Sequence, residues 1–311
     1  MFNPVIWSLR IAILLLSACL TAGCGQNDTN GATTPRVAAE KARPAIDSLD
    51  MATAQNRKAR IGDVSYDIEI TLDRDSEQFS GAVTIQFELS QSVAESDLTL
   101  DFGGGQVLGS VLNGNNVELP YNDFFITLPG TGLQPGNNEL SIQFRQDYSE
   151  NGAGLHRFVD PEDGLTYLYS YLWPYYANRV FPAFDQPNLK ARFSLQVNAP
   201  EDWVVVSTTK GEAQPAAANG MTHWRFDTTP KIATYAFSLH AGPYTVWEAD
   251  ADGIPLRLMA RQSLAEYVAV DEWFEVTRRG LQYYDDYFEI PYPFGKYDQL
   301  LVPDFMIGAM E

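Results

Sequence analysis

Cysteine is almost absent from this chain of 311 residues, which has only Cys19 and Cys24, both near its N-terminus. After Cys24 there is none, so disulfides, thiolate metal sites and cysteine nucleophiles are excluded from residues 25–311. Positive charge is also sparse, with 21 Lys and Arg against 40 Asp and Glu and a formal net charge of −19. A surface this negative repels phosphate backbones, so we expect no nucleic-acid partner.

Histidine is scarce, with only His156, His223 and His240. Their spacing cannot place two imidazoles on one helix face, so we interpret them as strand-edge or turn residues hydrogen-bonded to the backbone. The sequence also lacks a Gly-x-Ser-x-Gly elbow, a P-loop and a His-Glu-x-x-His motif. No catalytic residue and no metal ligand is therefore assigned within this chain.

Two other patterns resemble functional motifs but have simpler interpretations. The glycine run 103–105 lacks the Lys and the following helix of a phosphate-binding loop, and we interpret it as a turn. The adjacent carboxylates Asp285 and Asp286 would point in different directions on a helix, which is typical of a solvated face rather than of a catalytic pair.

The first apolar run, residues 11–20, follows a single positive charge at Arg10 and is far shorter than the ~20 residues that cross a bilayer. It matches instead the ~7–15 residue core of an export signal. Small residues lead from it into Cys24, and polar residues follow, so residues 1–23 resemble a bacterial lipoprotein signal peptide. We expect lipidation of Cys24, with Cys19 as the alternative site.

The lipid anchor has consequences for location. Several acyl chains on one cysteine hold a protein firmly to a membrane, since each buried methylene contributes about 0.8 kcal/mol. Gly25 follows Cys24, whereas an Asp there commonly signals retention at the inner membrane in bacterial lipoproteins. We therefore expect an exported protein anchored in the bacterial envelope, at the outer membrane and facing the periplasm.

The mature chain divides into a tether and a folded body. Residues 24–60 are rich in Ala, Thr, Asn, Asp and Gln and have no sustained apolar period, which predicts a flexible tether with at most one helical turn near 37–43. Alternating apolar and polar residues then predict strands over residues 66–72, 83–89, 98–102, 124–128, 140–144, 203–206, 222–226 and 235–239. The fold class that follows is mainly β, with an antiparallel β-sandwich or saddle over residues 61–247.

The pattern changes near residue 260. Apolar side chains spaced by four and three residues predict a helix over 266–288, which Pro291 and Pro293 end, and a strand at 296–302. We interpret residues 248–311 as the incomplete start of an α/β domain. Its helix would expose an apolar face, so we expect the fragment to aggregate or to fray at its C-terminus.

Three segments carry a resemblance to a known family. They are residues 154–161 (GLHRFVDP) with 167–170 (YLYS), residues 177–191 (ANRVFPAFDQPNLKA) and residues 293–311 (PFGKYDQLLVPDFMIGAME). In this order they resemble the N-terminal third of an M1-family zinc aminopeptidase of the aminopeptidase N group. The last four residues match the first four of that family's Gly-x-Met-Glu-Asn exopeptidase motif.

The resemblance implies a β-saddle packed on a thermolysin-like domain, with the substrate site in the cleft between them. It implies that Gly308, Ala309 and Met310 offer backbone contacts along an edge strand and that Glu311 binds the free α-amine of a peptide. A charge-assisted hydrogen bond of this kind contributes about 1.5–3 kcal/mol. The alternative is that Glu311 is only the frayed end of a broken chain.

One residue departs from the family pattern. Relatives usually carry Gln or Glu in the loop that corresponds to residues 171–179, and that side chain helps to bind the substrate amine, whereas Trp173 stands here. The resemblance therefore implies that Trp173 and the nearby Tyr171 line the substrate site. An indole binds a cation only through its π face, which contributes about 0.5–2 kcal/mol, and would narrow the first side-chain pocket. The alternative is that Trp173 and its tyrosine neighbours are core between the two domains.

The family's Zn²⁺ is held by a His-Glu-x-x-His motif and a more distant Glu, which would lie beyond Glu311. We therefore expect a full-length enzyme that removes N-terminal residues from peptides with a free amine, and a fragment that is inactive alone. An alternative from another class is a non-catalytic, lipid-anchored β-sandwich that binds peptides or a partner protein. A third is a purely structural envelope lipoprotein.

Overall fold

The computed structural model describes residues 43–90, 96–215, 220–305 and 307–310. The predicted signal peptide, Cys19, Cys24 and most of the predicted tether lie outside the described residues, as does Glu311. Strands dominate the described part, as the sequence predicts.

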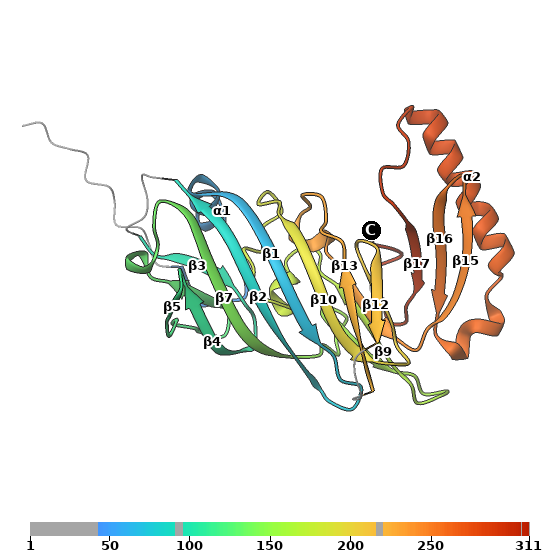
Figure 1. Ribbon diagram of the computed structural model, residues 1–311, viewed down its shortest axis with the longest axis horizontal. Coiled ribbons are helices and arrows are strands. Elements are labelled where there is room, and N and C mark those ends of the chain that lie inside the picture. Colours follow the sequence, from blue (N-terminus) through green and yellow to red (C-terminus); the bar gives the residue numbers. More distant parts are fainter. Residues whose placement is uncertain (1–42, 91–95, 216–219, 306, 311) are drawn as a thin grey trace, which may run out of the picture. The chain divides into compact units, whose positions relative to one another are not determined.

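The largest layer is an eight-stranded sheet in the order β12-β13-β10-β1-β2-β7-β4-β5 (Figure 1). Strand β1 pairs in parallel with β10 and antiparallel with β2, and every other pair in this sheet is antiparallel. The predicted antiparallel architecture is confirmed, with one parallel pair added. Its strands are β1 (Ile61–Thr71), β2 (Gln78–Leu89), β4 (Gln106–Leu112), β5 (Asn115–Asn116), β7 (Gly136–Asp147), β10 (Arg192–Pro200), β12 (Gly211–Pro215) and β13 (Met221–Phe226).

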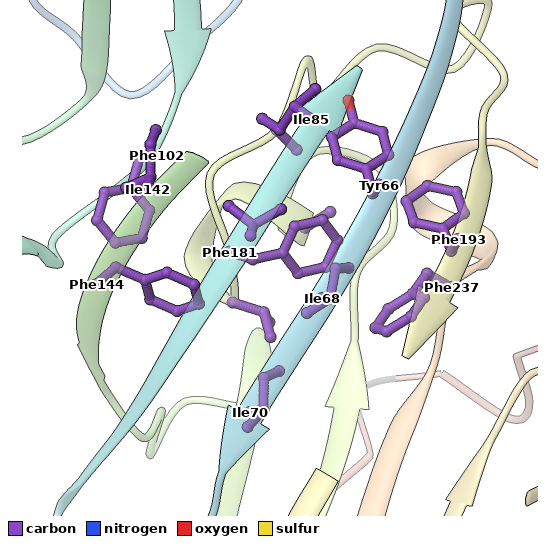
Figure 2. Packing of buried hydrophobic residues seen from close by; sticks show 14 of the residues in the cluster. Tyr66, Ile68, Ile70, Ile85, Phe102, Ile142, Phe144, Phe181, Phe193 and Phe237 are labelled. Atoms are coloured by element: carbon purple, nitrogen blue, oxygen red, sulfur yellow. The ribbon is translucent and has the colours of Figure 1, made fainter. Parts of the chain in front are cut away.

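The period of two in β1 explains how this sheet forms a core. Tyr66, Ile68 and Ile70 all point to one face and are buried, while the residues between them are more exposed. Figure 2 shows these side chains beside Phe193 and Phe181, and the Tyr66 and Phe193 rings stack with centroids 4.9 Å apart. Burial of a large side chain contributes about 1.5–3 kcal/mol, so this face drives the packing of the sheet.

A second layer closes the sandwich over the same core. It is a four-stranded sheet in the order β11-β14-β9-β8, and buried residues from it belong to the same cluster as those of β1. A separate pair joins β3 to β6. These strands are β3 (Leu98–Asp101), β6 (Phe125–Leu128), β8 (Gly154–Val159), β9 (Thr166–Tyr171), β11 (Val204–Ser207) and β14 (Leu239–Gly242).

Four short 3-10 helices link the strands, and one of them corrects a prediction. They are η1 (Gly130–Gly132), η2 (Ala177–Arg179), η3 (Thr234–Ala236) and η4 (Gln262–Tyr267). The predicted strand at 235–239 is wrong over its first half, because the Thr234 hydroxyl donates to Asp185 Oδ1 at 2.6 Å and the chain turns there. Phe237 still enters the core, which is why its position in the alternation looked strand-like.

A smaller α/β part follows. The strands β15 (Thr245–Ala251), β16 (Ile254–Ala260) and β17 (Tyr297–Leu301) form a sheet in that order, with β17 parallel to β16. The helix α2 (Val270–Phe288) lies within the predicted range and runs beside β15 (Figure 1). Its Phe274 is buried in one cluster with Leu256 and Leu258. The predicted domain boundary at residue 247 falls inside β15, which pairs with β16 along its whole length, so this part begins at Thr245.

The outer face of α2 remains apolar and exposed, as the helical periodicity predicts. Tyr284 and Phe288 are 58% and 59% exposed. Among the described residues, no helix is both long enough and apolar enough to cross a membrane.

The predicted tether is wrong over residues 43–60. Helix α1 (Met51–Arg60) is capped by Asp50, whose side chain accepts from the Thr53 amide at 2.8 Å. Arg57 and Arg60 are only 1% and 3% exposed. Because the residues that α1 buries are arginines, a search for apolar periodicity could not find the helix.

Arg57 owes its burial to one carboxylate. Asp101 is fully buried and accepts from Arg57 Nη1 at 2.7 Å, from Arg57 Nη2 at 3.0 Å and from Arg43 Nη1 at 2.5 Å. Burial raises the pKa of Asp101, but the two guanidinium groups outweigh it and hold that pKa below its usual value. Nearby Asp185 forms no ion pair with any cation in the described part of the chain, and burial raises its pKa to about 6.

We predict that Arg57→Ala lowers the free energy of unfolding of this chain by about 3 kcal/mol, because it leaves a buried carboxylate with one cation instead of two. Denaturant unfolding checks this value. Lys58→Ala, a change of an exposed cation on the same helix, is the control and should stay within about 0.5 kcal/mol of the unchanged chain. Equal effects of the two changes would contradict a dominant role for Arg57.

Candidate functional site

The candidate site lies where the C-terminal segment meets strand β9. The Tyr169 hydroxyl on β9 donates to the Pro303 carbonyl at 2.5 Å. At the end of the same strand, the rings of Tyr171 and Phe305 meet edge to face with centroids 5.3 Å apart. These two contacts bring residues 303–305 against the strand that leads into the loop carrying Trp173.

The two aromatic residues predicted for substrate binding differ in environment. Tyr171 is 4% exposed and packs against Phe305 and, with centroids 6.1 Å apart, against Tyr176. Trp173 is 49% exposed. Tyr171 is thus buried, as the core alternative expects, whereas Trp173 is half exposed among the described residues. Whether Trp173 lies between two complete domains stays a prediction.

The predicted peptide-binding segment is only partly described. Gly308 and Ala309 are exposed, Met310 is half-buried, and residues 307–310 do not form a strand. Glu311 lies outside the described residues. The structure thus brings residues 303–305 to the end of β9 and to the loop that follows it. The expected edge strand is not formed over residues 307–310. The substrate contacts of Gly308, Ala309, Met310 and Glu311 stay predictions.

A network of charges fixes strand β17 just before this segment. Asp298 accepts from Arg257 Nε at 2.8 Å and also contacts Lys296, whose ammonium donates to the Ser207 carbonyl at 2.6 Å. Burial raises the pKa of Asp298, but hydrogen bonds from Arg257 and the charge of Lys296 outweigh it and lower that pKa. The network therefore joins β16 and β17 to the end of β11 in the sandwich.

A second charged junction joins the same two parts. Asp160 ends the motif at 154–161, and its side chain accepts from Arg261 Nη1 and from the Ser263 hydroxyl, both at 2.5 Å. Neither Asp160 nor Asp298 received a role from the sequence, although both stand in the segments that carry the family resemblance. The family segments could therefore have pointed to these two carboxylates. Two of the cations that pair with them, Arg257 and Arg261, lie outside the segments.

Two of the three histidines hydrogen-bond to the backbone as the sequence predicts, but His156 alone of the three lies on an edge strand. His156 Nδ1 accepts from the Gly152 amide at 3.0 Å, and His240 Nδ1 accepts from the Ser170 amide at 3.4 Å. His223 instead pairs with the side chain of Asn198 at 2.9 Å. Burial, followed by the charge of Lys296, lowers the pKa of His240 to about 4, so this imidazole is neutral near pH 7.

The described part of the chain contains no cluster of side chains that could hold a metal ion. Within residues 43–90, 96–215, 220–305 and 307–310, no three side chains of His, Cys, Asp or Glu gather as a metal site would require. These residues do not fit a zinc centre, and we derive no chemical step through a metal.

Two family models match this chain. Residues 63–236 match the family described as the Peptidase M1 N-terminal domain, and residues 272–311 match the Peptidase family M1 domain. The chain is similar to Aminopeptidase N of Streptomyces lividans, with 38% identity over 272 residues that cover 85% of this chain and 31% of that protein. It is also similar to Aminopeptidase N of Acetobacter pasteurianus, with 29% identity covering 80% of this chain and 71% of that protein.

A more distant relative gives the same picture. Human Aminopeptidase N is 26% identical over 309 residues, which cover 90% of this chain and 32% of the human protein. The chain therefore spans about a third of the length of the Streptomyces and human relatives, and 71% of the Acetobacter relative.

We predict that Asp298→Asn weakens the attachment of β17 by about 2 kcal/mol, because charge-assisted hydrogen bonds from Arg257 and Lys296 are lost. The measurement is hydrogen exchange of the β16 and β17 amides at pH 7. Asp286→Asn, on the exposed face of α2, is the control and should leave those amides protected.

The same change should matter less in acid. The pKa of Asp298 is lowered in the folded chain, so its stabilisation is present above about pH 4, the usual range of an unfolded Asp, and is lost as the pH falls through the folded value. A difference between the two chains that grows on acidification would contradict this assignment.

Proposed function

Because the chain belongs to the M1 family of peptidases, we propose that it is the N-terminal portion of an aminopeptidase that removes N-terminal residues from peptides. The contact between Phe305 and Tyr171 supports this proposal most directly, because it brings a residue just before the predicted peptide-binding segment 308–311 to the strand that leads into the loop carrying Trp173.

The residues of this site have separate tasks in the proposal. Gly308, Ala309 and Met310 offer backbone groups along which the substrate chain lies, and Glu311 accepts hydrogen bonds from the α-ammonium. Trp173, with half of its surface exposed, adds its π face to the recognition of that cation and restricts the first side chain of the substrate. An enzyme that removes one residue at a time must identify a charged amine, and a carboxylate shielded from bulk water does this best.

Zn²⁺ is the cofactor we propose for the whole enzyme, in which it would act as a Lewis acid on the scissile carbonyl. The described residues of this chain do not form its site. Their own part is to bind and orient the peptide, and we propose that this chain alone hydrolyses nothing.

We also propose that the enzyme is exported and lipid-anchored through Cys24, at the outer membrane and facing the periplasm. The apolar run at 11–20 and the small residues before Cys24 support this location. Peptides with a free amine would then be met outside the cytoplasm.

We expect the full-length protein to hydrolyse an aminoacyl amide with a free amine and to leave the N-acetylated form intact. Glu311→Gln should lower kcat/KM for the free-amine substrate roughly 10- to 150-fold, because a charge-assisted hydrogen bond is lost. Glu272→Gln, an exposed residue of α2, is the matched control and should have no effect. Tight binding of peptides without any hydrolysis would favour the non-catalytic binding module instead.

The anchor has its own test. Cys24→Ser should move the expressed protein from the membrane fraction to the soluble fraction, since a protein without its acyl chains loses its affinity for lipid. Cys19→Ser is the control and should leave the protein membrane-bound. The reverse result would assign lipidation to Cys19, and membrane binding by both variants would contradict a lipid anchor at either position.

A further inference from the structure

The segment 43–60, which we call the N-terminal strap, contacts more than the carboxylate that buries it. The guanidinium of Arg43 has several partners. Its Nη1 donates to Asp101 Oδ1 at 2.5 Å, and its Nη2 donates to the Tyr175 hydroxyl at 2.9 Å. The same guanidinium lies over the Phe125 ring at 4.5 Å and also donates to the Ser48 carbonyl at 3.0 Å. Arg43 is therefore fixed on several sides, and it fixes Tyr175 in turn.

A second contact joins the strap to the same loop. Asp47 accepts from Arg179 Nη2 at 2.6 Å, and the Arg179 guanidinium lies over the Tyr176 ring at 4.5 Å. Burial raises the pKa of Tyr175, so its hydroxyl stays neutral and free to accept from Arg43. The strap thus contacts the loop at residues 175 and 179.

Hydrogen bonds within the loop connect Tyr175 to the residues around Trp173. The Tyr176 amide donates to the Leu172 carbonyl at 2.9 Å, which closes a turn around Trp173. Asn178 Nδ2 donates to the Tyr175 carbonyl at 3.0 Å and to Asp185 Oδ2 at 2.9 Å. A shift of Tyr175 would therefore move the turn that carries Trp173.

The other side of this turn faces the candidate site. Tyr176 packs against Tyr171, and Tyr171 packs against Phe305. Aromatic pairs of this geometry attract each other beyond the area they bury, so the position of the turn and that of residues 303–305 are coupled.

We propose that Arg43 is a positioning residue for the substrate site: by holding Tyr175, it fixes the loop 172–179 and with it the place of Trp173 relative to Pro303 and Phe305. The effect of Arg43 on substrate binding rests on the proposed function. Its effect on the position of the loop does not. Arg43 acts through Tyr175 and touches neither substrate nor metal.

The competing explanation is that Arg43 only neutralises Asp101. Arg57 distinguishes the two, because it donates to the same carboxylate and to Thr99 but, within the described residues, makes no hydrogen bond to the loop. Arg43→Lys and Arg57→Lys each leave two positive charges beside Asp101, but each replaces one planar guanidinium with an ammonium group. Only Arg43→Lys also removes the hydrogen bond from Arg43 Nη2 to the Tyr175 hydroxyl. Tyr175→Phe removes that hydroxyl and leaves both arginines unchanged.

The experiment compares these three variants in the full-length protein by hydrogen exchange and by steady-state kinetics. We expect the amides of Tyr176, Arg179 and Val180 to exchange about 5-fold faster in Tyr175→Phe and Arg43→Lys than in Arg57→Lys. The KM for a free-amine aminoacyl amide should rise about 5-fold in the first two variants, with kcat changed less, and should stay unchanged in Arg57→Lys.

The two readouts separate failure of this proposal from failure of the proposed function. Unchanged loop exchange in Tyr175→Phe, or an equal effect of Arg57→Lys on both readouts, overturns the positioning role. Faster exchange without any change in KM also overturns it, because the loop would then move without consequence for substrate. If the unchanged protein hydrolyses nothing, the proposed function and the substrate role fail together, and exchange still decides whether the strap fixes the loop.

Discussion

The carboxylate of Asp101 connects parts of the chain that lie far apart in sequence. It takes hydrogen bonds from Arg43 and Arg57 in the strap and from the Asp185 amide at 2.9 Å, while its own backbone bridges to Ala183. Two cations and several donors offset the cost of burying one negative charge. The strap, strand β3 and the segment 183–185 are therefore held together by this one carboxylate and its neighbours.

Charges of the same kind join the sandwich to the α/β part. Asp160 and Asp298 are the centres of two junctions, with Arg261 on one and with Arg257 and Lys296 on the other. Both carboxylates lie in motifs that resemble the M1 family, whereas the apolar core needs only a pattern of side chains. Other motif residues, such as Phe181 and Phe184, lie in the apolar core, so the motifs contribute both to these junctions and to the packing of the sheets.

Period-two alternation was enough to predict the strands around Ile68 and Ile70, and apolar spacing was enough to predict α2, because both elements bury a continuous apolar face. The strap escaped prediction because Arg57 is buried by charge pairing rather than by hydrophobicity. The exposure of Trp173 and the pairing of Arg257 with Asp298 depend on tertiary contacts between distant residues, which a single sequence does not specify.

Native-state hydrogen exchange of the unchanged protein in low denaturant tests most directly whether Asp101 joins the strap and the loop into one unit. The account predicts that the amides of α1 and those of residues 176–180 open together, with the same free energy and the same dependence on denaturant. Loop amides that stay protected after α1 has opened would contradict it.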